Sequence, residues 1–281
     1  MRKLELRILK EHSGRQIKSV LKSELMLSGS IIKQIKLKED GITLNGVRVH
    51  TDARVNEGDI LLVNLESSKL NTKNEHVVYA DDDIVIFDKP AGMAVHPAPL
   101  LKGELTVKDV LSPCGGFHPV NRLDKGTTGL MVIALSGYMH DRLKALLHTD
   151  GFVREYLAVT EGIPDKLKGR IDAKIARQGA IKREVCENGA PALTDYEVVK
   201  TSGKWALVKL RLLTGRTHQI RVHMAHIGCP LAGDWLYGRE DKDIISRPAL
   251  HSSRIILKHP ITGEEIDIFS PLPKDMEQLV K

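Results

Sequence analysis

The sequence has few sulfur-containing and aromatic side chains. Its 281 residues include three Cys, four Phe, two Trp and five Tyr. Cys114, Cys186 and Cys229 are an odd set without a CxxC pair, which is typical of free thiols in a reducing compartment. A disulfide framework or a cysteine-based zinc site is therefore not expected.

Long hydrophobic runs are also missing. The longest run without a charged side chain, residues 126–140, contains three glycines and several hydroxyl groups. A membrane-spanning helix needs about 18 or more apolar residues. The first sixteen residues, MRKLELRILKEHSGRQ, carry charges throughout and lack the apolar stretch of a secretory signal. We therefore expect a cytoplasmic protein without a membrane partner.

Nucleotide and metal motifs are absent from the sequence as well. There is no GxGxxG, no GxxxxGK[ST] and no HExxH, so we expect no cofactor and no metal. His218, His223 and His226 lie close together in the sequence, which leaves a metal-dependent hydrolase as an alternative. At helical spacing, however, the three side chains do not converge on one face.

The overall composition is that of a basic globular protein. The sequence is 42% hydrophobic and 28% charged, with a formal net charge of +6. Such a length indicates one large domain, or one large and one small domain. A net positive charge favours a polyanionic partner, although a basic enzyme of another kind would fit the charge equally well.

A polar segment at residues 66–76, ESSKLNTKNEH, separates two patterned regions. We therefore predict a domain at residues 1–68, a linker at 69–76 and a second domain at 77–281. In the first domain, residues 19–38 have helical periodicity around a Ser-Gly-Ser break. A hairpin turning at Asn45-Gly46 follows, and then a strand after Gly58.

This order of helices, hairpin and strand resembles the alpha-L RNA-binding motif, which occurs in a small-subunit ribosomal protein and in several RNA-modifying enzymes. The resemblance implies a small α/β domain that binds RNA. The alternative is a small solvated domain of another use.

The second domain alternates predicted strands and helices. Strands are expected at residues 84–87, 129–136 and 154–162, and an amphipathic helix at residues 137–148. Hairpins are expected to turn near Gly203 and near Gly263. Hairpins outnumber crossovers, so we predict an α+β fold with a mixed, mainly antiparallel sheet and flanking helices.

The segment HPVNRLDKGTTGL, residues 118–130, places Asp124 between Arg122 and Lys125. A nearby Arg stabilises the ionised form of a carboxylate and offsets the effect of burial. The small residues that follow leave room for a close approach of substrate. Taken alone, the segment could equally be a structural turn with a salt bridge.

A second segment, residues 212–238, contains a predicted helix that begins after Thr217 as N-cap and ends near Gly228. Ile220, Met224 and Ile227 would share its core face, with Arg221 on roughly the opposite side. Arg221 is thus a candidate partner for Asp124. Arg216 precedes the helix, near an N-terminus that favours phosphate.

Five motifs occur in a fixed order, and together they resemble the pseudouridine synthases of the large-subunit-ribosomal-RNA type. The motifs are DKPAGMAVHP, RLDKGTTGLM, REYLAVTEG, GRTHQIRVHMAHIGCPLAGDWLYG and LHSSRIILKHPITGE. The resemblance implies the pseudouridine synthase fold with a central catalytic cleft. It also implies an enzyme that isomerises uridines in RNA, with no cofactor, acting as a monomer.

The resemblance assigns roles residue by residue. It implies that Asp124 is the essential aspartate, that Tyr156 packs on the uracil and that Arg221 pairs with Asp124. Arg122 would fill the stack vacated by a flipped-out nucleotide, a step that costs a few kcal/mol. Further substrate contacts are implied for Asn121, Leu123, Thr128, Arg216 and His218. Asn121 and Thr128 depart from the family pattern, which usually has His and Ser there.

Three questions stay open at this point. Large-subunit ribosomal RNA is the family's commonest substrate, and transfer RNA is the alternative. Asp124 could attack ribose C1′, add to the uracil ring or remove a sugar proton. A non-catalytic RNA-binding or ribosome-assembly factor on the same fold is the alternative function.

Overall fold

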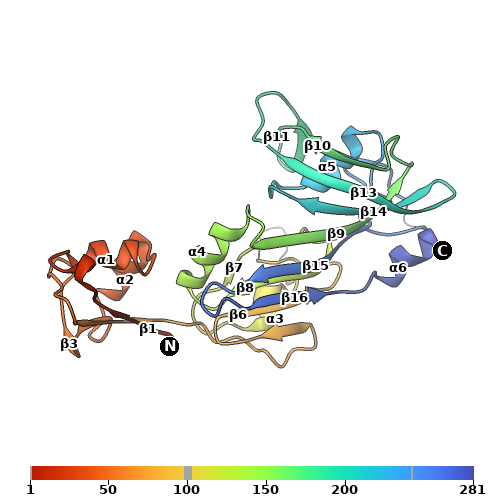
Figure 1. Cartoon of the computed structure of the whole chain (residues 1–281). Coiled ribbons are helices and arrows are strands. Elements are labelled where there is room, and N and C mark those ends of the chain that lie inside the picture. The colour runs from red at the N-terminus through yellow and green to blue at the C-terminus, as the bar shows by residue number, and fades with distance from the viewer. Residues whose placement is uncertain (1, 98–102, 242) are drawn as a thin grey trace.

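The computed structural model describes residues 2–97, 103–241 and 243–281. At one end, a four-stranded sheet in the order β1-β4-β2-β3 packs against two short helices (Figure 1). Its elements are β1 (Arg2–Arg7), η1 (Lys10–His12), α1 (Ile17–Ser23), α2 (Gly29–Ile35), β2 (Ile42–Leu44), β3 (Val47–Arg48) and β4 (Ile60–Leu65).

The sequence predicted most of these elements. The helical break is real: α1 ends at Ser23, and the side chain of Ser28 caps α2 by accepting a hydrogen bond from the Ile31 amide. The hairpin turns at Asn45 and Gly46, which have positive φ values of 52° and 81°. The sequence did not predict strand β1. Its two leucines alternate with charged side chains, and the strand pairs with only one neighbour, β4.

The larger sheet has ten strands, the first of which begins at residue 77. Its main path runs β10-β13-β14-β9-β15-β8-β6-β5, with β16 paired to β15 and β7 paired to β8. The strands are β5 (Val77–Ala80), β6 (Ile84–Lys89), β7 (His118–Pro119), β8 (Thr128–Ala134), β9 (Phe152–Glu161), β10 (Lys168–Asp172), β13 (Leu193–Ser202), β14 (Trp205–Leu212), β15 (Leu250–Lys258) and β16 (Glu265–Phe269).

The remaining elements flank this sheet or extend from it (Figure 1). They are α3 (Val107–Leu111), α4 (Gly137–Leu146), α5 (Gln219–His226), α6 (Lys274–Glu277), η3 (Gln278–Val280) and a separate hairpin of β11 (Ile175–Gln178) and β12 (Lys182–Val185). The predicted hairpins β13–β14 and β15–β16 are present. The α+β prediction of a mixed, mainly antiparallel sheet with flanking helices is confirmed.

Strand β8 is the centre of the core and explains why its sequence is an unbroken apolar run. Met131 and Ile133 pack in one cluster with residues of α3 and α5. Leu130 and Val132 pack in another cluster with residues of α4. A strand covered on both faces needs no polar alternation.

The parallel pairing of β8 with β15 fixes the start of β8. His251 lies opposite Thr128, and Ser252 lies opposite Gly129. Gly129 has a φ of +101°, and a Cβ there would lie 2.2 Å from the backbone oxygen of Ser252. Only glycine permits this close approach. The loop that precedes β8 is thereby held against β15.

The two sheets meet at α4, the helix nearest the N-terminal elements in Figure 1. Tyr138 of α4 packs within the N-terminal hydrophobic cluster, and Arg2 forms an ion pair of 3.3 Å with Asp83.

The three cysteines are free thiols. Among the described residues, no helix is long and apolar enough to cross a membrane.

Candidate active site

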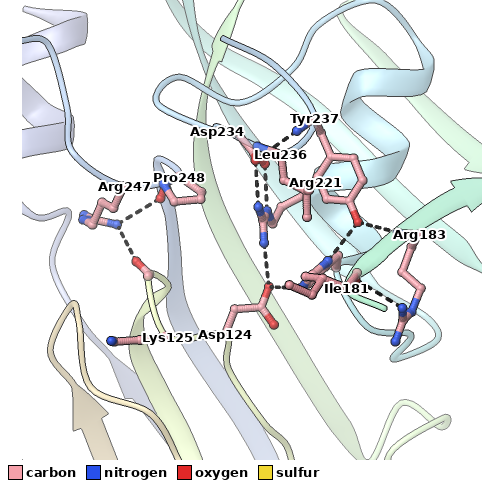
Figure 2. Close-up of polar contacts among 12 residues, drawn as sticks. Asp124, Lys125, Ile181, Arg183, Arg221, Asp234, Leu236, Tyr237, Arg247 and Pro248 are labelled. Atoms are coloured by element: carbon pink, nitrogen blue, oxygen red, sulfur yellow. Dashed lines mark hydrogen bonds and ion pairs between the residues drawn. The ribbon is translucent and has the colours of Figure 1, made fainter. Parts of the chain in front are cut away.

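The loop between β7 and β8 carries Asp124 and is held in place by hydrogen bonds that its backbone carbonyl groups accept. The Thr127 amide donates to the Asp124 carbonyl at 3.0 Å. Lys89 donates from Nζ to the Lys125 carbonyl at 3.2 Å. Arg247 donates from Nη1 to the Gly126 carbonyl at 3.4 Å (Figure 2). Two buried cations thus orient the backbone directly after Asp124.

Lys89 is an unusual group in this position. Its side chain is 1% exposed, and Nζ also donates to the carbonyls of Pro90 and Met93. Burial lowers the pKa of Lys89 to about 7, and the nearby charge of Arg247 acts in the same direction. Near neutral pH the amine is therefore poised between its charged and neutral forms.

The Asp124 carboxylate is one-third exposed and faces two groups of the 212–238 segment. Oδ2 lies 3.4 Å from Nη1 of Arg221 and 3.7 Å from Nε2 of His218. The predicted pairing of Asp124 with Arg221 is therefore present as one long contact.

Arg221 has a closer partner, which the sequence reasoning missed. Its Nε and Nη2 each donate a 2.7 Å hydrogen bond to the fully buried carboxylate of Asp234 (Figure 2). Burial would lower the pKa of Arg221, but the hydrogen bonds that it donates to Asp234 raise the pKa. The sequence indicated only Asp124 as a candidate partner of Arg221. Asp234 stood inside a quoted motif, but nothing in its spacing indicated this contact.

Helix α5 begins differently from the prediction. Its N-cap is His218, with a φ of +57° and no side-chain cap, so the expected Thr217 cap was wrong. The side chain of Gln219 is instead the partner of a backbone amide before the helix: its Oε1 accepts a hydrogen bond from the Arg216 amide at 2.9 Å. The helix is also buried on nearly every side, and Arg221 is only 5% exposed. Arg221 reaches Asp124 from within the protein.

His218 is connected to the hairpin β11–β12 through Tyr237. The hydroxyl of Tyr237 accepts a 2.8 Å hydrogen bond from the Arg183 amide and lies 2.8 Å from Nδ1 of His218. Because the Arg183 amide is the donor, the Tyr237 hydrogen is free to point at Nδ1. Burial lowers the pKa of His218, which favours the neutral ring. A neutral ring that accepts from Tyr237 at Nδ1 carries its hydrogen on Nε2, the nitrogen nearer Asp124.

A cavity of about 780 Å³ opens in front of Asp124, with a pocket of about 60 Å³ next to it. Most of the predicted site residues line the cavity: Asn121, Arg122, Leu123, Asp124, Tyr156, Arg216 and His218. Arg221 lines the smaller pocket. The structure does not bring Thr128 to either, because its hydroxyl is buried 2.9 Å from Nδ1 of His251.

Two of these residues are buried beside the cavity. Tyr156 is 4% exposed on β9, and burial raises the pKa of its hydroxyl. Asn121 uses its Oδ1 to accept from the Val132 amide at 2.8 Å, while its Nδ2 has no partner in the described part of the chain. Asn121 thus ties the loop to the sheet and keeps one donor unused.

The charges that line the cavity are mostly positive. Arg122, Lys144, Arg154, Arg183 and Arg216 contribute to it, and Asp124 is the one carboxylate among the described lining residues. Such a surface attracts a polyanion.

The histidines of the alternative metal site are separated: His223 contacts Thr194 and the Ala173 carbonyl, whereas His226 is exposed.

Comparisons with known proteins agree with this geometry. A family model described as RNA pseudouridylate synthase matches residues 83–226. The ribosomal large subunit pseudouridine synthase D of Haemophilus influenzae is 35% identical over 294 residues, which cover 96% of this chain and 86% of the relative. The uncharacterized RNA pseudouridine synthase YlyB of Bacillus subtilis is 35% identical over 264 residues, 87% of this chain and 86% of the relative.

A solved structure is also similar. Human RNA pseudouridylate synthase domain containing 4 is 27% identical, with a TM-score of 0.58, and the match covers 72% of this chain and 92% of that chain. This match confirms the expected pseudouridine synthase fold. The chain therefore belongs to the RNA pseudouridylate synthase family and is an isomerase that acts on RNA.

Proposed function

We propose that Asp124 is the catalytic carboxylate and that it acts on a uridine swung out of the RNA into the cavity. The observation that carries this proposal is the 3.4 Å contact between Asp124 and Arg221 at the wall of a basic cavity. A guanidinium at this distance can orient a carboxylate through a charge-assisted contact. An ionised carboxylate can act as a nucleophile or as a base.

The isomerisation balances without an outside reagent. The bond from ribose C1′ to N1 of uracil breaks, and a bond from C1′ to C5 forms. A proton leaves C5, and N1 gains one. No electron acceptor or energy source is consumed, so the cavity has to supply a carboxylate, a wall for the freed base and a route for one proton.

The other lining residues would bind the nucleotide. Tyr156 supplies an aromatic ring for the uracil, and stacking on such a ring contributes about 1–3 kcal/mol per base. Arg122 is exposed at the mouth of the cavity, where a long cation can occupy the gap in the stack. Asn121, Leu123, Arg216 and His218 would contact the ribose, the base edges or the phosphates.

The proposed substrate is large-subunit ribosomal RNA. The relatives of known target, including the Haemophilus influenzae protein, are named ribosomal large subunit pseudouridine synthase D. Their similarity to this chain extends over most of its length. Comparison of pseudouridine in large-subunit ribosomal RNA with and without the gene would test this choice, and a site lost from transfer RNA instead would contradict it.

We further propose that residues 1–68 are an alpha-L type RNA-binding domain, with a linker at 69–76 before the catalytic domain at 77–281. In support, strands β1 to β4 form their own sheet over a hydrophobic cluster whose buried members all come from residues 8–65, apart from Tyr138. Lys and Arg are more frequent than Asp and Glu there. Phosphate contacts from such a domain would position the RNA without reading its sequence.

The decisive experiment replaces Asp124 by Asn, which keeps the shape of the side chain and removes its charge. We expect no pseudouridine in RNA incubated with this variant, while RNA binding persists. The matched control is Asp150→Asn, because Asp150 is an exposed carboxylate outside the cavity. Full activity of Asp124→Asn would exclude the proposed role and favour an RNA-binding or assembly function.

A further inference from the structure

Arg154 is a buried cation for which the catalytic proposal has no use. It precedes Tyr156 by two residues on β9, so both side chains lie on the same face of the sheet. The Arg154 side chain is only 4% exposed. Its Nη2 donates to the Leu147 carbonyl at 3.2 Å, and its Nε has no partner within residues 2–97, 103–241 and 243–281.

Other buried arginines of this protein have carboxylate partners. Arg221 is paired with Asp234, and Arg247 is paired with Asp275 at 2.8 Å. No described carboxylate forms an ion pair with Arg154. Burial of an uncompensated charge opposes folding. Such a residue is therefore not explained by its contribution to the stability of the free protein.

The surroundings of Arg154 identify the missing partner as an anion. Arg154 lines the 780 Å³ cavity on its basic side, with Lys144 and Arg216 also in the lining. A Cβ at Gly215 would lie 3.3 Å from Nη1 of Arg154, so the absence of a side chain at 215 leaves space beside the guanidinium. A planar guanidinium with unused donors matches the oxygen atoms of a phosphate.

We propose that Arg154 binds a backbone phosphate of the RNA beside the target uridine. This inference rests on the proposed function for the identity of the ligand. Two residues of an extended strand span about 7 Å. A nucleotide whose base lies against Tyr156 therefore brings a neighbouring phosphodiester group toward Arg154. The phosphate supplies the charge that the free protein lacks at this position.

The first test measures thermal unfolding of the full chain with and without inorganic phosphate. Without phosphate, Arg154→Met should unfold at the same temperature as the unchanged protein or above it, because the variant removes an unpaired buried charge. Phosphate should raise the unfolding temperature of the unchanged protein and leave that of Arg154→Met where it was. Arg154→Lys, which keeps a positive charge, should retain part of the shift.

Arg247→Met is the matched control, since Arg247 is a buried arginine with a carboxylate partner. It should lower the unfolding temperature and keep the response to phosphate. A loss of stability in Arg154→Met as large as that of Arg247→Met would overturn the proposal. Lys209→Met removes an exposed cation outside the cavity. This variant should change neither the unfolding temperature nor the response of that temperature to phosphate.

The second test measures binding of RNA isolated from a strain without the gene, over a range of salt concentrations. For Arg154→Met the slope of log affinity against log salt should fall by about 0.7 to 1, the contribution of one phosphate contact. A lowered slope without protection by inorganic phosphate means that the site takes only RNA phosphate. An unchanged slope overturns the proposal, whether or not inorganic phosphate protects the protein.

The outcome is separable from that of the catalytic proposal. Arg154→Met should weaken RNA binding and raise KM, whereas Asp124→Asn should abolish product formation and leave binding intact. Should Asp124→Asn stay active, the assignment of Asp124 fails. The phosphate response of Arg154 is still measured independently, because it requires no turnover.

Discussion

Arg221 is shared unequally between two carboxylates: it makes two hydrogen bonds of 2.7 Å to Asp234 and one contact of 3.4 Å to Asp124. Asp234 is fully buried, and its Oδ1 also accepts from the Leu236 amide at 3.1 Å. Asp234 thus fixes the guanidinium plane, and one nitrogen of Arg221 is left for Asp124, the proposed catalytic carboxylate. In this arrangement Asp234 is a positioning residue.

Replacement of Asp234 by Asn should therefore destabilise the protein. Removing one partner of a buried pair leaves the other charge uncompensated and costs about 3–5 kcal/mol of unfolding free energy. Denaturant unfolding measures this loss. The control is Asp267→Asn, whose exposed pair with Arg254 should contribute less than about 1 kcal/mol. Equal effects of the two variants would contradict the special role of the buried pair.

The hydroxyl of Tyr237 should matter for catalysis through His218. In Tyr237→Phe the imidazole loses the partner that places its hydrogen on Nε2, and the contact to Asp124 is no longer oriented. An ordinary hydrogen bond such as that between Tyr237 and His218 contributes about 0.5–1.5 kcal/mol, so single-turnover rates should fall roughly twofold to tenfold. RNA binding should stay nearly constant. A variant with an unchanged rate would show that the orientation of His218 is unimportant.

Some parts of the structure could be read from local sequence, and the reason is physical. The turn at Asn45-Gly46 depends on residues that tolerate positive φ, and the run at residues 128–134 reflects a strand buried on both faces. Both signals lie within a few consecutive residues. The resemblance to a known family then named seven of the residues that line the cavity, but not Lys144, Arg154 or Arg183.

The contacts that position these residues could not be read in this way. Asp234 follows Arg221 by thirteen residues and reaches it through a loop, so no helical spacing relates the two. A helical wheel placed Arg221 opposite the core face of the helix. That opposite face is buried as well, and it contacts the buried carboxylate of Asp234. Thr217 failed as a cap because the side chain of Gln219 folds back to the Arg216 amide. Tertiary contacts decide each of these positions.

The buried amine of Lys89 should make stability depend on pH. Its pKa is about 7 in the folded protein, below the ordinary value of 10.5. Between these values the unfolded chain binds more protons, so the free energy of unfolding rises with pH, by up to about 1.4 kcal/mol per pH unit. Below pH 7 both states are protonated, and the full cost of burying the charged amine opposes folding.

The measurement compares the unchanged protein with Lys89→Met between pH 7 and pH 9.5. Other groups titrate equally in both proteins, so the difference in slope isolates Lys89. We expect the slope to be smaller in Lys89→Met. Parallel stability curves over this pH range would show that the amine is charged in the folded state, and that its three carbonyl contacts hold a full positive charge.

Gly129, near the start of the central strand β8, should tolerate replacement poorly. In Gly129→Ala the new Cβ would lie 2.2 Å from the Ser252 carbonyl oxygen at a φ of +101°, so β8 and β15 would have to separate. We expect a loss of about 3 kcal/mol or more in unfolding free energy, together with lower activity, because Asp124 lies on the loop entering β8. Gly137→Ala is the control, since Gly137 begins α4 and a Cβ added there would have nothing within 4 Å. That change should be neutral or stabilise by about 0.4–1 kcal/mol, and equal losses in the two variants would contradict the role of the β8–β15 contact.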